Sequence, residues 1–69
     1  MKNFVKLTMT SNSRTNKSVF VNILNIETIY TSQKNEANTL ITLIGGESDF
    51  ITVEENLSEV VRLIREVQQ

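Results

Sequence analysis

Apolar and polar residues alternate along five short segments of the chain. Alternation with a period of two is typical of β-strands that bury one face. Polar stretches rich in asparagine separate the segments, and the pair Gly45-Gly46 supplies the positive φ of a tight hairpin turn. The pattern therefore predicts strands at Phe4–Thr10, Ser18–Asn22, Ile26–Ser32, Thr39–Ile44 and Asp49–Val53.

The connections between these segments are short and polar. The first two strands are expected to pair as a hairpin around a loop at residues 11–17. The segment Asn22-Ile23-Leu24-Asn25 interrupts the alternation, and we predict a tight turn or a single helical turn bracketed by its two asparagines. Residues 33–38 are expected to form a polar turn before the fourth strand.

The period changes after the fifth strand and predicts a helix. Its apolar stripe follows the spacing i, i+3, i+4, i+7, i+10, with Leu63 at the edge. Asn56 is a suitable N-cap, and Glu59 lies three residues later, where it can bond back as in a capping box. The stripe consists of Leu57, Val60, Val61, Ile64 and Val67.

These elements define an α+β fold: a small antiparallel sheet of four to five strands followed by one C-terminal amphipathic helix. The length of 69 residues allows a single domain, which we expect to span residues 1–69. One helix can cover only one face of such a sheet. The face expected beneath it carries Val5, Leu7, Met9, Val19, Val21, Ile51 and Val53.

The opposite face is also apolar. It is expected to hold all three phenylalanines, joined by Leu40 and Ile44 or by Ile41 and Leu43, depending on the register. Soluble monomers rarely expose such a patch, so we predict a homo-oligomer with sheets packed face to face or strands joined edge to edge. The alternative is a sheet that curls into a partial barrel and buries both sets. The interface is expected at Phe4, Phe20, Phe50, Tyr30, Leu40 and Ile44.

Tyr30 has a second interpretation, as a half-buried strand residue whose hydroxyl stays in water. With either role for Tyr30, the sequence predicts a protein-interaction or assembly module with a regulatory or accessory function. Its partner is a second copy of the chain or another protein. A small ligand held between subunits is left open.

Composition limits the chemistry that this chain can perform. There is no Cys and no His, which excludes disulfides, thiolate metal sites and the commonest general base. The hydroxyl side chains of Thr10, Ser11, Ser13 and Ser18 have no base partner in a recognisable catalytic pattern. We therefore expect no enzymatic activity, no metal and no cofactor. Domains this small often need a disulfide, a metal or a partner subunit for stability, and a partner subunit is the remaining choice here.

Charge is distributed unevenly although the formal net charge is only −1. Residues 1–34 carry five basic and one acidic side chain (+4), and residues 35–69 carry two basic and seven acidic side chains (−5). This asymmetry has three interpretations: charge that simply faces water, complementarity between two subunits, or a basic face that binds nucleic acid. The alternative function is thus a small nucleic-acid-binding regulator, although such domains usually carry more basic residues. It would use Lys2, Lys6, Arg14, Lys17 and Lys34.

Two further patterns bear on location. Residues 1–10 lack the apolar stretch of a signal peptide, and no apolar run approaches the roughly 20 residues of a membrane span. Absence of Cys suits a reducing compartment. We expect a cytoplasmic protein without membrane contact.

Four motifs in fixed order resemble a known family. They are Val5-Lys6-Leu7-Thr8, then Val21-Asn22 with the strand Ile26 to Ile29, then Ile41-Thr42-Leu43-Ile44-Gly45, and last Val53-Glu54-Glu55-Asn56 with the helix that follows. In this order they resemble the small flagellar and swarming-motility proteins of the FlbD type and related short bacterial and phage proteins. The resemblance implies a sheet-plus-helix fold and a non-enzymatic regulatory or accessory role. This chain is longer than that pattern at residues 11–17 and around Lys34–Asn38.

Overall fold

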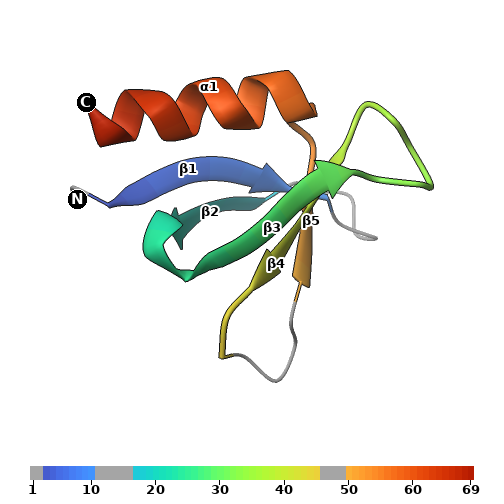
Figure 1. Cartoon of the computed structure of the whole chain (residues 1–69). Coiled ribbons are helices and arrows are strands. Elements are labelled where there is room, and N and C mark those ends of the chain that lie inside the picture. The colour runs from blue at the N-terminus through green and yellow to red at the C-terminus, as the bar shows by residue number, and fades with distance from the viewer. Residues whose placement is uncertain (1–2, 11–16, 46–49) are drawn as a thin grey trace.

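The computed structural model describes residues 3–10, 17–45 and 50–69 of the chain. Five strands form one antiparallel sheet, and the twelve-residue helix α1 (Leu57–Gln68) follows them (Figure 1). The order across the sheet is β2-β1-β5-β4-β3, so β2 and β3 are its edges. This confirms the predicted α+β class. The strands are β1 (Phe4–Met9), β2 (Lys17–Asn22), β3 (Ile26–Thr31), β4 (Thr39–Leu43) and β5 (Phe50–Val53).

The predicted strand boundaries are close to the observed ones. The strands β1, β3 and β4 end one residue before their predicted ends, and β2 begins one residue earlier, at Lys17. The predicted first residue of β5, Asp49, lies outside the described residues, as does the predicted loop at 11–17 except for Lys17. In the predicted glycine turn, Gly45 has a φ of 80°, the positive value expected there, and Gly46 is not among the described residues.

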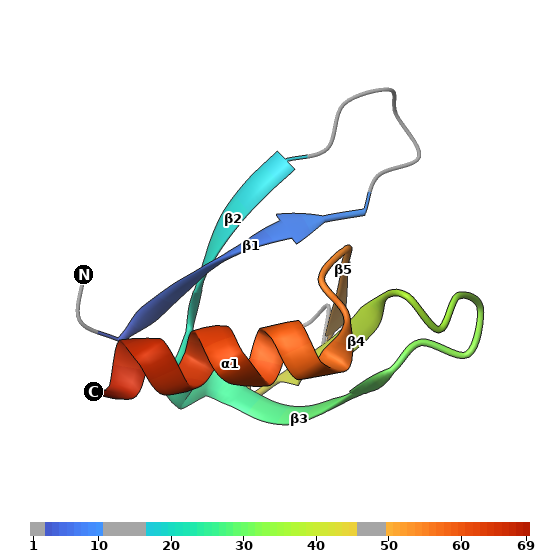
Figure 2. The same cartoon turned by 90° about the horizontal axis from the view of Figure 1, so that it is seen from above.

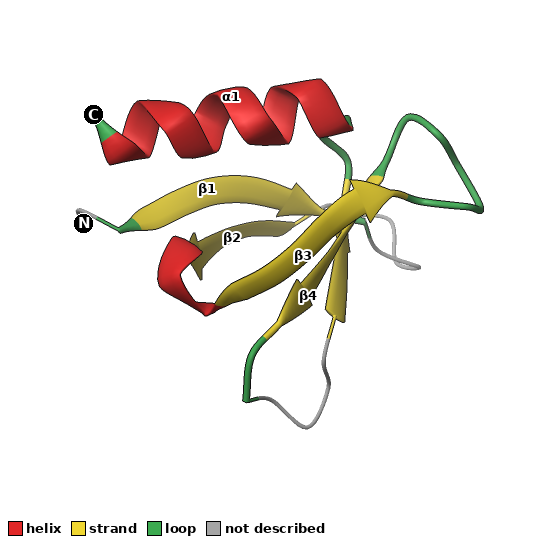
Figure 3. Ribbon diagram, in the orientation of Figure 1, coloured by secondary structure: helices red, strands yellow, loops and turns green. Residues whose placement is uncertain are grey.

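A single turn of 3-10 helix, Ile23–Asn25, connects β2 to β3 (Figure 3). The side-chain oxygen of Asn22 caps it by accepting a hydrogen bond of 3.0 Å from the Leu24 N–H. The Ile23 N–H donates to the carbonyl of Asn3 (2.8 Å) and so ties the turn to the start of β1. The predicted helical turn is confirmed. Because it joins the two edge strands, the sheet must fold back on itself.

The two halves of the sheet meet at one point. The strand β1 pairs with β2 over its whole length, but with β5 it shares the single register pair Met9↔Val53. From this junction the β1–β2 hairpin and the three strands β3, β4 and β5 diverge (Figures 1 and 2). The flanking backbone hydrogen bonds run from Thr10 N–H to Thr52 O (2.9 Å) and from Glu54 N–H to Thr8 O (2.8 Å).

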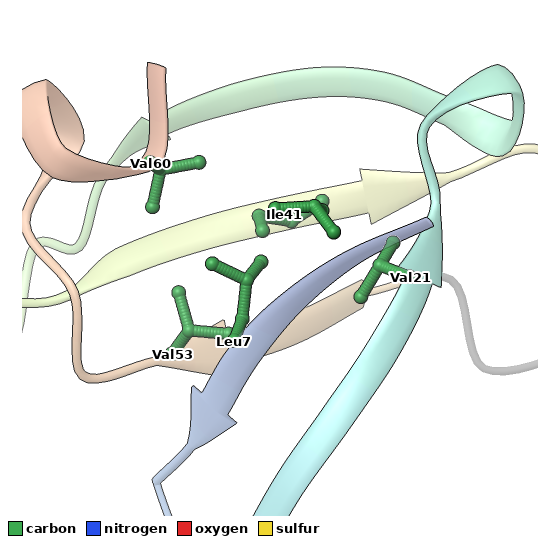
Figure 4. Packing of buried hydrophobic residues seen from close by; sticks show 6 residues of the cluster. Leu7, Val21, Ile41, Val53 and Val60 are labelled. Carbon is green, nitrogen blue, oxygen red and sulfur yellow. The ribbon is translucent and has the colours of Figure 1, made fainter. Parts of the chain in front are cut away.

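The helix α1 lies over the inner face of the folded sheet and contacts β1 and β3 (Figure 2). Beneath it, buried side chains of β1, β2, β4 and β5 point toward one another (Figure 4). Ile41, not Leu40, is the buried apolar residue of β4, which settles the register left open by the sequence. The buried core consists of Val5, Leu7, Val21, Ile41, Val53 and Val60.

The contact face of α1 differs slightly from the predicted stripe. Val60 is fully buried, and Leu63, Ile64 and Val67 pack against the core. Leu63 therefore lies within the apolar contact and not at its edge, so the stripe is rotated away from Val61. Among the described residues, no helix has the length and apolar character that crossing a bilayer requires.

The start of α1 is capped as expected, but not as a full capping box. The Asn56 side-chain oxygen accepts a hydrogen bond of 2.9 Å from the Glu59 N–H. The Glu59 carboxylate, expected to bond back to the cap, instead accepts hydrogen bonds from Arg62, which also pairs with Glu66. The hydrogen bond from Arg62 holds the pKa of Glu59 below its ordinary value. Stability from this pair is therefore present above the ordinary carboxyl pKa and is lost as the pH falls through the lowered one.

A partly buried hydrogen bond holds the residue before the helix cap against the sheet. Thr39 is fully buried, and its hydroxyl donates to the backbone carbonyl of Glu55 (2.7 Å). The Glu55 carboxylate in turn accepts from the Thr8 N–H (3.0 Å). One residue of the connection between β5 and α1 is thus held by both β4 and β1.

Replacing Thr39 by valine keeps its shape but leaves the Glu55 carbonyl without its donor. We expect Thr39→Val to lower the free energy of unfolding by about 1–3 kcal/mol, the usual cost of an unsatisfied buried group. Urea denaturation followed by circular dichroism measures this loss. Thr31→Val, at the exposed residue paired with Thr39, is the control and should stay within about 0.5 kcal/mol of the parent. Equal stabilities for the two variants would contradict the anchoring role.

Candidate protein-interaction surface

The face of the sheet turned away from α1 carries large apolar side chains that the described chain leaves exposed. Exposure is 59% for Phe50, 51% for Phe20, 45% for Tyr30 and 37% for Phe4. The sheet does fold back on itself, yet these rings stay outside, because successive residues of a strand point to opposite faces. The alternative of a partial barrel that buries both sets is therefore wrong.

The six residues predicted for an interface do not form one patch. Phe4, Phe20 and Ile44 line a cleft beside β2. Tyr30, Leu40 and Phe50 line a hollow on the outer face of β3, β4 and β5. The divergence of the two halves of the sheet separates the groups. The six predicted residues therefore belong to two separate surfaces, which the sequence could not show.

The outer face of β3, β4 and β5 is called here the three-strand face. The outward residues of its two paired rows carry no charge, and the charged residue of these three strands is Glu27, which is exposed at the register shift of β3. The register of this face aligns Tyr30, Leu40 and Thr52 in one row across the strands. The row beside it contains Phe50, Thr42 and Thr28. The Thr28 N–H donates to the Thr42 hydroxyl (3.0 Å), so some polar groups of this face already bond to one another.

A hollow of about 350 Å³ lies on the three-strand face between the rings of Tyr30 and Phe50. Beyond it, the turn after β3 contributes Ser32, whose N–H donates to the carbonyl of Asn38 (3.0 Å). The only charged residue that lines the hollow is Lys34, which is exposed. The hollow is thus an apolar depression with a polar border, the usual form of a protein contact site.

The cleft beside β2 has a volume of about 470 Å³ and no charged residue in its lining. One wall is formed by the consecutive β2 residues at positions 19–22, together with Phe4. Leu43, Ile44 and Ile51, from the ends of β4 and β5, form the wall opposite. We predicted Val19 and Ile51 only for the inner face. No local pattern could mark them as cleft residues, because the cleft arises where distant strands diverge.

The basic residues of the nucleic-acid alternative are scattered where the structure describes them. Lys6 shares the outward face of the β1–β2 hairpin with its register partner Phe20. Lys17 pairs with Met9 and belongs to the opposite face, and Lys34 lies beside the hollow of the three-strand face. Lys2 and Arg14 lie outside the described residues. Three lysines in these positions do not form a path along a phosphate backbone.

Of the hydroxyl side chains considered as nucleophiles, the structure describes Thr10 and Ser18. The Thr10 hydroxyl donates to the carbonyl of Thr52 (3.3 Å), and Ser18 is exposed on the edge strand. Ser11 and Ser13 lie outside the described residues. In residues 3–10, 17–45 and 50–69, acidic side chains form no group of three that would suit a metal ion.

Comparisons of the chain with protein-family models, curated proteins and solved structures find no match. The resemblance to FlbD-type proteins therefore stays a prediction. The function must be argued from the two exposed surfaces and their chemistry.

The exposed rings and the core should differ sharply in their effect on the folded monomer. We expect Phe50→Ser and Phe20→Ser to lower the free energy of unfolding by no more than about 1.5 kcal/mol, because half or more of each side chain is already in water. Leu7→Ala, in the buried core, should cost about 2–5 kcal/mol. Denaturant titrations at high dilution, where the chain is monomeric, measure these free energies. If the phenylalanine variants lost as much stability as Leu7→Ala, the rings would belong to the core.

Proposed function

We propose that this chain is a non-enzymatic protein-interaction module that forms a homo-oligomer through the three-strand face. The observation that carries the proposal is the exposure of Phe50 and Tyr30, with Leu40 between them, on a sheet face that α1 does not cover. A second copy supplies the missing layer by placing its own three-strand face on the first.

The energetic reason is the small size of the domain. A fully buried phenylalanine contributes roughly 2–3 kcal/mol, and a domain of this length has only about 3–10 kcal/mol of total stability. Phe50 keeps 59% of its surface in water. Burying most of one such ring in each subunit therefore adds stability that is large on the scale of the fold.

The chemistry of the face favours a second copy as the occupant. A two-fold interface places the same residues opposite one another, so any charge at its centre repels its own copy. The outward residues in the paired rows of the three-strand face carry no charge. Glu27, at the register shift of the edge strand β3, and Lys34, beside the hollow, lie at its border. Two sheets can then pack about 10 Å apart with interdigitating side chains, as in a β-sandwich.

The size of the face sets the expected affinity. Three strands cover on the order of 300 Å² at normal strand spacing, well below the roughly 800 Å² per partner of a standard interface. The dimer is therefore weak, with dissociation in the micromolar to millimolar range. A weak, reversible contact suits the regulatory or accessory role implied by the FlbD-type resemblance. We place that role in the cytoplasm of a bacterial or phage-infected cell.

Sedimentation equilibrium over micromolar to millimolar concentrations tests the proposal. We expect the parent chain to approach the dimer mass and Phe50→Asp to stay monomeric, because the new charge faces its own copy. Phe20→Asp is the matched control, since this exposed ring lies on the other surface and should leave the association unchanged. Added salt should change the parent's dissociation constant little, because no charge pair is buried.

Two outcomes contradict this function. A parent chain that stays monomeric at millimolar concentration removes the homo-oligomer. A dimer that Phe20→Asp abolishes and Phe50→Asp leaves intact moves the interface away from the three-strand face.

A further inference from the structure

Within residues 3–10, 17–45 and 50–69, one side of the edge strand β2 has no neighbouring strand to bond its backbone groups. The register pairs Phe4 with Asn22, and the next residues, Asn3 and Ile23, share a backbone hydrogen bond. Because alternate pairs of an antiparallel ladder are hydrogen-bonded, the odd-numbered residues of β2 turn their N–H and C=O groups toward β1. The backbone groups of Ser18 and Phe20 therefore face the open side. Among the described strands, β2 has β1 as its one neighbour.

The apolar cleft follows this open edge. Its lining includes both Val19 and Val21, on the inner side of β2, and Phe20, on the outer side. A pocket lined by consecutive residues of both faces must run along the edge of a strand. An added strand in the cleft would place alternate side chains against the inner valines and against Phe20. Ile51 and Ile44 close the cleft from the far wall.

The other edge of the sheet is protected and β2 is not. The strand β3 has a register shift between Ile26 and Thr28 that interrupts its regular ladder, it carries the exposed Glu27, and α1 also contacts this strand. Bulges, edge charges and covering elements are the usual means of preventing strand addition. The register of β2 is regular over its six pairs, and its only charged residue is Lys17, at the beginning. The sheet is thus open to a further strand on one side.

Charge selects the kind of strand. The charged residues of β1 and β2 are Lys6 and Lys17, both exposed, and neither strand carries an acidic residue. Lys6 lies next to Phe20 across the ladder, so both lysines are within about one Debye length of a strand placed along the edge. The cleft lining itself is uncharged. A second copy of β2 would bring its own Lys17 to this edge, whereas an acidic segment would find opposite charge.

We infer that the β2 cleft binds an extended segment of a partner protein that is apolar at alternate positions and carries acidic residues at its ends. The segment joins the sheet as a sixth strand, with its backbone bonded to Ser18 and Phe20. This site lies apart from the three-strand face, so it goes beyond self-association and gives the module a second binding function.

The direct test titrates the full chain with the labelled synthetic peptide Glu-Val-Thr-Val-Thr-Val-Glu and follows fluorescence anisotropy. We expect saturable binding that weakens several-fold with added salt. The same peptide with Lys in place of both Glu residues should bind at least ten-fold more weakly. A peptide N-methylated at alternate backbone positions should not bind, because it cannot bond the edge. Equal affinity of the acidic and N-methylated peptides would overturn strand addition, and equal affinity of the acidic and basic peptides would overturn the charge assignment.

Variants of the protein locate the site. Ser18→Pro removes an N–H that faces the open edge, so it should abolish peptide binding while the circular dichroism spectrum is preserved. Ser18→Ala is the matched control and should bind as the parent does. If Ser18→Pro does not fold, the N-methylated peptide still tests whether binding requires backbone hydrogen bonds. Undiminished binding to a folded Ser18→Pro variant would overturn the site.

The same measurements separate this inference from the proposed function. Phe50→Asp should bind the peptide normally although it no longer dimerises. Ser18→Pro should dimerise normally although it no longer binds the peptide. Loss of self-association in Ser18→Pro would instead make β2 the contact between two copies and would overturn the assignment of the cleft to a partner protein.

Discussion

The whole architecture depends on the junction at Met9↔Val53, the only register pair between β1 and β5. A longer ladder would hold the five strands in a continuous, gently twisted sheet. Because the strands part from this point, the sheet opens into two arms, and α1 can contact both β1 and β3 and seal the inner face. The same divergence also creates the cleft beside β2, where apolar residues of the two arms are left uncovered.

The junction is reinforced by side chains that secondary-structure patterns do not reveal. The Glu55 carbonyl accepts a hydrogen bond from the Thr39 hydroxyl, and its carboxylate accepts one from the Thr8 N–H. The start of α1 is therefore fixed against both arms of the sheet. Fixing this point places Val60 over the core, where it is fully buried. A fold with so few buried side chains can then close around one short helix. The position of the helix, and thereby which face stays open, follows from a few polar contacts at its beginning.

Local patterns were sufficient for the elements and for most of their faces, but not for the face of β4, whose register they left open. Alternation placed the phenylalanines opposite the core, and the asparagines around Ile23–Asn25 indicated the helical turn. Long-range features were out of reach: the strand order, the divergence of the arms and the cleft depend on contacts between residues far apart in sequence. Glu59 shows that even a local contact cannot always be predicted from spacing. The cap at Asn56 and Arg62 are both three residues away from it, and only the structure shows that it pairs with Arg62.

The placement of the aromatic residues argues most strongly for association. The chain has three phenylalanines, one tyrosine and no tryptophan, and all four rings are among the exposed side chains. Aromatic side chains normally dominate cores, because each buries 150–250 Å². Here the core is entirely aliphatic, since the space between one short helix and a folded sheet is filled by valine, leucine and isoleucine. Rings that the core does not use, held on two surfaces of regular strands, are positioned as contact residues, in agreement with the enrichment of aromatics at protein interfaces.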